Sequence, residues 1–111
     1  MAAAETAESR NQPPRDDLEC CEEMARVFKA LANPTRLGIL RRIIDGSMCV
    51  GDLQDELDRS QPNISQHLGI LRDRGVVVSE RDGTRVSYRP ADPRLGELLE
   101  VAAQIFEIEH P

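Results

Sequence analysis

Residues 49–68 read CVGDLQDELDRSQPNISQHL, and this pattern predicts two short helices joined by a tight turn. The first helix carries apolar residues at helical spacing, which are Val50, Leu53 and Leu57. Polar residues 58–60 then interrupt that spacing. Ser60 is suited to cap the second helix, because its hydroxyl accepts hydrogen bonds from the backbone N–H groups of a first turn. The second helix has its own apolar stripe, formed by Ile64, Leu68 and Leu71.

Two more helices are expected ahead of this stretch. Residues 17–31 carry apolar side chains in a helical rhythm, which are Leu18, Met24, Val27, Phe28 and Leu31. Asn33-Pro34 is typical of a helix start, with Asn33 as the N-cap and Pro34 as the first helical residue. The apolar spacing then continues to Ile44, and Gly46 is expected to end that helix with a positive φ.

A β-hairpin is expected after Gly75, the residue predicted to end the helix that Ser60 starts. Val76-Val77-Val78 is β-branched throughout, and further on Val86 and Tyr88 alternate with polar residues. Between the two runs lies Asp82-Gly83, a dipeptide suited to a two-residue hairpin turn. A final helix is then expected from about Asp92 to Glu109, because leucines, alanine, Ile105 and Phe106 form a long apolar stripe there.

This order of elements predicts a mainly α winged helix-turn-helix, in which the hairpin is the wing. We expect one domain over residues 16–111. Residues 1–15 are rich in Ala, Glu, Ser, Asn and Pro, and they are expected to form a flexible N-terminal tail.

The second helix of the pair offers short hydrogen-bonding side chains on its outer face. Gln and Asn pair bidentately with adenine, and Ser can contact a base or a phosphate. The DNA contacts predicted on this helix are Ser60, Gln61, Asn63, Ser65, Gln66, His67 and Arg72. Arg81 and Arg85 flank the hairpin turn and are predicted to enter the minor groove or grip the backbone. Double-stranded DNA is therefore the expected partner.

Charge is unevenly distributed along the chain. The formal net charge is −6, yet residues 59–89 carry six arginines against three acids. Because an acidic protein is repelled by DNA as a whole, the arginines are expected to gather on one face. A balanced, solvated surface would account for the same charges, so the prediction depends on their combination with the polar helix.

Three motifs make the chain resemble the ArsR/SmtB family of bacterial transcriptional repressors. They are FKALANPTRL at 28–37, CVGDL at 49–53 and SQPNISQHL at 60–68. The resemblance covers roughly residues 22–106 in order and spacing. It implies a homodimer built from the first and last helices, which binds an inverted-repeat operator and leaves it when an effector binds.

The resemblance also implies a thiolate site. In the arsenic-sensing members of the family, the Cys of a Cys-Val-x-Asp-Leu motif is a metalloid ligand, and Cys49 keeps that position. Gly51 stands where the two-cysteine version has its second thiol. Some members add cysteines near the N-terminus, and Cys20 and Cys21 resemble that arrangement. Soft trivalent arsenic takes three sulfurs, so arsenite or antimonite is the implied effector, bound by these three cysteines.

Several alternatives stay open at this point. Adjacent residues of a regular helix point about 100° apart, so Cys20 and Cys21 share an ion only if the helix start is irregular. The third thiolate comes from the same subunit or from the partner. The cysteines also suit a redox or persulfide switch, or, beside Glu19, Glu22 and Glu23, a sensor of cadmium, lead or zinc. Two readings without an effector also stay open: Cys49 is a small buried hydrophobe, or the chain is a DNA-architectural or protein-interaction module.

Other classes of protein are disfavoured. A chain of 111 residues is too short for a barrel or a two-domain dinucleotide enzyme, and catalytic motifs are missing from it, so no enzyme is expected. We expect no membrane partner, because apolar runs long enough to span a bilayer are absent. Without an apolar signal segment, three cysteines are expected as reduced thiols in a cytoplasmic protein.

Overall fold

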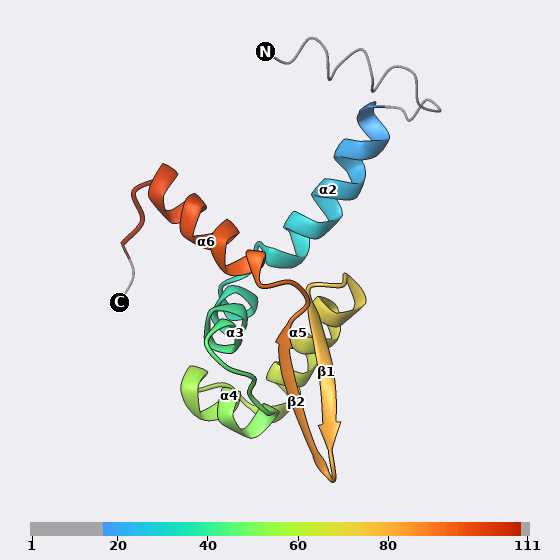
Figure 1. Ribbon diagram of the computed structural model, residues 1–111, viewed down its shortest axis with the longest axis vertical. Coiled ribbons are helices and arrows are strands. Elements are labelled where there is room, and N and C mark those ends of the chain that lie inside the picture. The colour runs from blue at the N-terminus through green and yellow to red at the C-terminus, as the bar shows by residue number, and fades with distance from the viewer. Residues whose placement is uncertain (1–16, 110–111) are drawn as a thin grey trace.

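The computed structural model describes residues 17–109, and the predicted tail at 1–15 lies outside them. The elements are, in order, α2 (Asp17–Leu31), α3 (Pro34–Ile44), α4 (Val50–Leu57), α5 (Gln61–Asp73), β1 (Val77–Asp82), β2 (Arg85–Pro90) and α6 (Arg94–Ile105) (Figure 1). The predicted succession of helices and hairpin is confirmed. Within this described range, no helix is long and apolar enough to cross a membrane.

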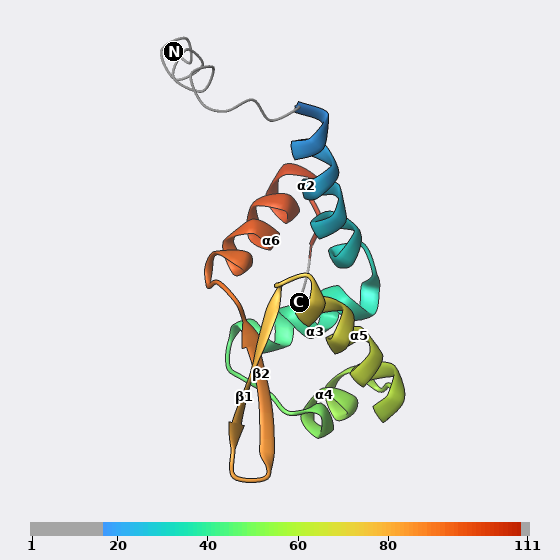
Figure 2. The same cartoon turned by 90° about the vertical axis from the view of Figure 1, so that its right-hand side faces the viewer.

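The molecule has a helical body from which two helices and a hairpin project. Helices α3, α4 and α5 form the body, α2 and α6 rise from one end of it, and the β1–β2 hairpin extends toward the opposite end (Figures 1 and 2). The core between the body helices and the base of the hairpin consists of Leu31, Ile39, Leu40, Ile43, Leu53, Ile64, Leu68, Leu71, Val76 and Val77. The apolar stripes expected for the helix pair therefore dock both helices on α3.

Helix starts agree with the predicted caps. The Asn33 side-chain oxygen accepts hydrogen bonds from the backbone N–H of Thr35 at 2.9 Å and of Arg36 at 3.1 Å. The Ser60 hydroxyl accepts one from the backbone N–H of Asn63 at 3.3 Å. These bonds satisfy N–H groups that have no partner within a helix, so α3 and α5 start where the sequence predicts.

The prediction that Gly75 ends helix α5 is confirmed, and the end of the helix is a Schellman motif. Gly75 has φ +73°, its N–H donates to the Arg72 carbonyl at 3.0 Å, and the Val76 N–H donates to the Leu71 carbonyl at 2.9 Å. The same prediction for Gly46 is wrong. Helix α3 ends at Ile44, its C-cap Asp45 has φ −83°, and Gly46 is not among the residues with positive φ.

The hairpin turn lies one residue later than predicted. Asp82, the last residue of β1, pairs with Arg85, the first residue of β2, so the two turn residues are Gly83 and Thr84. Gly83 has φ +66° and takes the first central position, where a type II′ turn places glycine. The positive φ was expected in this turn, but Asp82 belongs to the strand.

Helix α6 is shorter than predicted, ending at Ile105 instead of Glu109. Glu107 adopts φ +52° and its N–H donates to the Gln104 carbonyl at 3.3 Å. The Ile108 N–H then donates to the Ala103 carbonyl at 2.8 Å. These two bonds form a second Schellman motif. The residue with positive φ is Glu107 and not a glycine, so the sequence contained no signal for this helix end, and the apolar stripe alone predicted too long a helix.

Candidate nucleic-acid interface and the three thiols

Helix α5 presents a polar outer face because its apolar face is docked. Ile64, Leu68 and Leu71 are at most 2% exposed, whereas Ser60, Gln61, Gln66 and Arg72 are exposed. The helix contacts both α3 and α4, so the pair α4–α5 is a helix-turn-helix held by a third helix. The predicted contacts Ser65, Asn63 and His67 are half-buried on the same helix.

Two of the predicted contacts bond to each other. The Gln61 side-chain amide donates to the Ser65 hydroxyl at 2.8 Å, one helical turn away on the exposed surface. Asn63 differs, since its side-chain oxygen is buried and, among the residues that the structure describes, has no hydrogen-bond partner. A buried acceptor without a donor is costly, so binding that turns the Asn63 amide toward a base edge would relieve it.

His67 is held by an arginine of α3 that sequence reasoning did not single out. Arg36 Nη1 lies 3.2 Å from His67 Nδ1. Burial, and after it the Arg36 charge, lower the pKa of His67 below its ordinary 6.5. His67 is therefore neutral at pH 7.

The two predicted wing arginines have different surroundings. Both side chains are exposed, but Arg85 Nη2 donates to Asp52 Oδ2 of α4 at 3.1 Å. The Arg81 side chain makes no ion pair or hydrogen bond within residues 17–109. Arg81 is thus available to a phosphate at once, whereas Arg85 must exchange Asp52 for one. Asp52 is the second residue that the sequence did not reveal, because its partner lies 33 positions away.

A backbone bridge fixes the wing to the segment before α4. The Met48 N–H donates to the Tyr88 carbonyl at 3.1 Å, and the Tyr88 N–H donates to the Met48 carbonyl at 2.8 Å. With the Arg85–Asp52 pair, this bridge gives the wing two connections to α4 and the segment before it. Wing and helix-turn-helix therefore form one reading surface.

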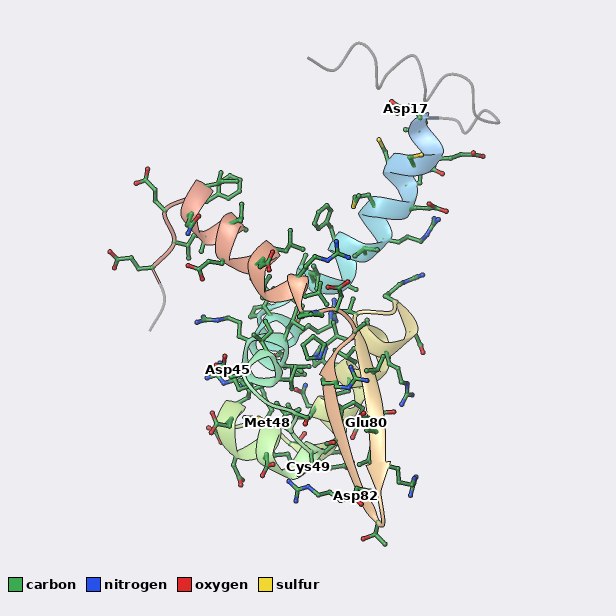
Figure 3. The ribbon with its side chains drawn as sticks, viewed as in Figure 1. Asp17, Asp45, Met48, Cys49, Glu80 and Asp82 are labelled. Carbon is green, nitrogen blue, oxygen red and sulfur yellow. The ribbon has the colours of Figure 1, made fainter. Side chains whose placement is uncertain are left out.

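The three cysteines are not brought together in one chain. All are free thiols; Cys20 and Cys21 are exposed near the start of α2, and Cys49 is the half-buried N-cap of α4. In Figure 3 the start of α2, marked by Asp17, and Cys49 lie at opposite ends of the molecule. Across residues 17–109, no three His, Cys, Asp or Glu side chains are grouped to hold a metal ion. A three-thiolate site within a single chain is therefore not formed.

A docked helix-turn-helix followed by an arginine-bearing hairpin defines a winged helix-turn-helix DNA-binding domain. Residues 33–79 match the model of the arsR family of bacterial regulatory proteins. The chain belongs to this family, and it is a transcriptional repressor of the ArsR/SmtB type and not an enzyme.

Similar proteins agree with this assignment. An uncharacterized HTH-type transcriptional regulator of Methanocaldococcus jannaschii is 40% identical over 89 residues, which cover 79% of this chain and all of that protein. The HTH-type transcriptional repressor SmtB of Mycobacterium tuberculosis is 42% identical over 78% of this chain. A probable mercury resistance operon repressor of Streptomyces lividans is 41% identical over 70% of it. The chain covers 62% of each of these last two repressors.

A solved structure with the same arrangement is dimeric. It is the homodimeric winged helix-turn-helix DNA-binding domain of a possible ArsR-family transcriptional regulator from Mycobacterium bovis. The TM-score is 0.73 at 32% identity, with 90% of this chain and 98% of that chain covered.

Proposed function

We propose that this repressor leaves its operator when trivalent arsenic or antimony binds Cys20, Cys21 and Cys49, with the thiolates supplied by two subunits. The observation that carries the proposal is the distribution of the thiols. Two stand exposed near the start of α2, and the third stands beside the connections that hold the wing. An ion that joined them would link the dimerisation helices to the reading surface. Because Cys20 and Cys21 are successive residues of α2, such an ion would also have to unwind the start of that helix.

A homodimer is supported by the apolar surface of α2, α6 and the turn that follows α6. Large hydrophobic side chains are exposed there, and they are Leu18, Met24, Phe28, Leu98, Val101, Ile105, Phe106 and Ile108. Exposed apolar patches of this kind mark interaction surfaces. At 100° per residue, Cys20 and Cys21 fall on the side of α2 that carries Met24 and Phe28. Both thiols then face a second copy that covers this side, and an inverted-repeat operator matches its twofold symmetry.

The position of Cys49 explains how binding of the ion would weaken the binding of DNA. Its neighbour Met48 forms the backbone bridge to Tyr88 of the wing, and Asp52, one turn further along α4, pairs with Arg85. Helix α4 also packs on the recognition helix α5. Ligation that shifted the start of α4 would therefore move wing and recognition helix together, away from the positions that fit two adjacent half-sites.

Thiolate chemistry favours a soft ion over the harder alternatives. Thiolates select soft ions, whereas the hard cations prefer carboxylates and water. The Streptomyces relative is named for mercury resistance, and mercury is likewise a soft, thiol-seeking metal. The exposure of Cys20 and Cys21 favours one second candidate, a redox or persulfide switch, because exposed thiols are open to oxidation.

The experiment is a competition between DNA and effector. A duplex selected by the wild-type protein from a random library is labelled, bound under reducing, metal-free conditions, and titrated with arsenite, antimonite, cadmium, zinc and a polysulfide. Release by arsenite, abolished in Cys49→Ser and in Cys20→Ser/Cys21→Ser, is the expected result. If arsenite released Cys49→Ser from the duplex as completely as it releases the wild type, that result would contradict the proposed thiolate site. Release by polysulfide alone would establish the redox switch instead.

A further inference from the structure

Arg36 connects three helices with one side chain. Its Nε donates to the Ala30 carbonyl at 2.5 Å, its Nη2 donates to the Lys29 carbonyl at 3.2 Å, and its Nη1 lies 3.2 Å from His67 Nδ1. Arg36 itself belongs to the first turn of α3, Lys29 and Ala30 to the last turn of α2, and His67 to α5. The dimerisation helix and the recognition helix are thus joined through one guanidinium.

The geometry uses what a guanidinium alone provides. The last carbonyls of a helix have no partner within it, and Arg side chains nearby are suited to bond them. The planar fork of Arg carries five N–H donors at fixed angles, so two of its arms can hold the end of α2 while the third holds α5. A change in the direction of α2 would therefore move the Arg36 guanidinium and alter its contact with His67.

The same contact fixes the tautomer of His67. Arg is always protonated, so Nη1 is the donor and His67 Nδ1 must accept, which leaves the ring proton on Nε2. The lowered pKa of His67 agrees with this neutral form. Nε2 is not among the buried atoms that lack a partner, and within residues 17–109 it makes no hydrogen bond, so its N–H is accessible to solvent.

We propose that Arg36 is a positioning residue for sequence-selective DNA binding: it fixes α5 to the end of α2 and holds His67 as an Nε2–H donor. The recognition helix then reads DNA correctly only while α2 keeps its place. This inference does not depend on the identity of the effector, since it concerns how any displacement of α2 is transmitted.

The test compares two arginines of the same helix. Arg36→Gln removes the fork. Arg42→Gln is the matched control, because it removes the same charge from α3 and breaks a partly exposed ion pair with Glu56 at 3.6 Å. Each variant is titrated against the selected duplex and against a scrambled duplex of equal length. We expect Arg36→Gln to lower the ratio of the two affinities about tenfold, whereas Arg42→Gln changes both affinities alike.

Two further measurements separate positioning from simple loss of structure. Arg36→Lys keeps the charge but replaces the planar fork by a single ammonium group, so it should keep a wild-type melting temperature within a few degrees and still lose part of the selectivity. The nitrogen NMR shifts of His67 should report a protonated Nε2 in the wild type and a mixture of tautomers in Arg36→Gln. In a His67→Ala background, Arg36→Gln should have a smaller effect than in the wild type.

Three results would each overturn the inference. They are equal selectivity in Arg36→Gln and Arg42→Gln, an unchanged His67 tautomer in Arg36→Gln, and fully additive effects of Arg36→Gln and His67→Ala. If Arg36→Gln fails to fold, Arg36→Lys decides: wild-type selectivity in that variant contradicts the proposal, and reduced selectivity in a folded protein supports it.

Discussion

Gly51 stands where the two-cysteine version of the motif has its second thiol, and glycine has no side chain to supply one. A Cβ built there lies 3.9 Å from Cys49 Sγ, in ordinary van der Waals contact, and the residue is exposed. Position 51 can therefore accept a thiol beside Cys49 without strain. Positions 49 and 51 are thus close enough in space, as well as in sequence, to resemble the two-cysteine motif.

Gly51→Cys should convert Cys49 into a dithiol site. We expect arsenite to bind more tightly and to release the selected duplex even when Cys20 and Cys21 are both replaced by Ser. Gly51→Ser is the matched control, because it adds a side chain of similar size without a soft ligand. Calorimetric titration with arsenite measures the gain. Equal affinities of the Cys and Ser variants would show that Cys49 is not placed to ligate.

His67 gives a pH dependence whose sign follows from its lowered pKa. In the unfolded chain the pKa is ordinary, near 6.5, so in the window below that value the unfolded state binds more protons. The stability that this residue contributes is complete above the unfolded pKa and is lost as the pH falls through the folded pKa. Arg36→Gln removes only the smaller of the two causes, so it should raise the folded pKa somewhat and make this slope shallower, while burial still keeps the pKa below 6.5. Urea unfolding at a series of pH values measures the slope, and an unchanged slope in Arg36→Gln would show that the Arg36 charge does not contribute.

Helix α5 offers a direct test of the cap that ends it. Gly75 has φ +73° and Gly69 lies within the helix, and an added Cβ meets no atom within 4 Å at either position. Steric clashes therefore do not contribute to the difference between the two variants. Gly75→Ala should lower the free energy of unfolding by about 1 kcal/mol, because Ala is strained at positive φ. Gly69→Ala should raise it by up to about 1 kcal/mol. Chemical denaturation of both variants checks this, and shifts of the same sign would contradict the cap.

At the scale of elements, local signals predicted most of the fold. The caps Asn33 and Ser60 and the terminator Gly75 act through bonds within a few residues, so the sequence reveals them. Helix α6 was overestimated because its Schellman motif uses Glu107, a residue with no preference that announces it. The contacts that complete the site were out of reach, since Arg36 meets His67 across 31 positions and Arg85 meets Asp52 across 33. Such pairs form only once the helices and strands have packed against one another.

The whole molecule is expected to function as a dimer through the apolar surface of α2 and α6. Ile105 is 65% exposed at the end of α6, and a charge there would be buried in the interface. Ile105→Glu should weaken dimerisation by about 2 kcal/mol or more and reduce affinity for the selected duplex, because two half-sites are no longer bound by linked domains.

Gln104→Glu is the matched control for that variant. It places the same charge one residue earlier, where the side chain is exposed and points about 100° from Ile105, toward the side of α6 that carries Glu97 and Glu100. Sedimentation equilibrium measures both proteins. A dimer of Ile105→Glu as stable as that of Gln104→Glu would place the interface elsewhere.

The shared thiolate site is tested most directly with mixed dimers. One chain carries Cys49→Ser and the other Cys20→Ser/Cys21→Ser, each with its own affinity tag, so that dimers containing both can be isolated. Such a dimer keeps one complete set of three thiols only if the site lies between subunits. We predict that it binds one arsenite per dimer and leaves the selected duplex, whereas neither parent homodimer does. A mixed dimer that stays on the duplex, as its parents do, would contradict the account.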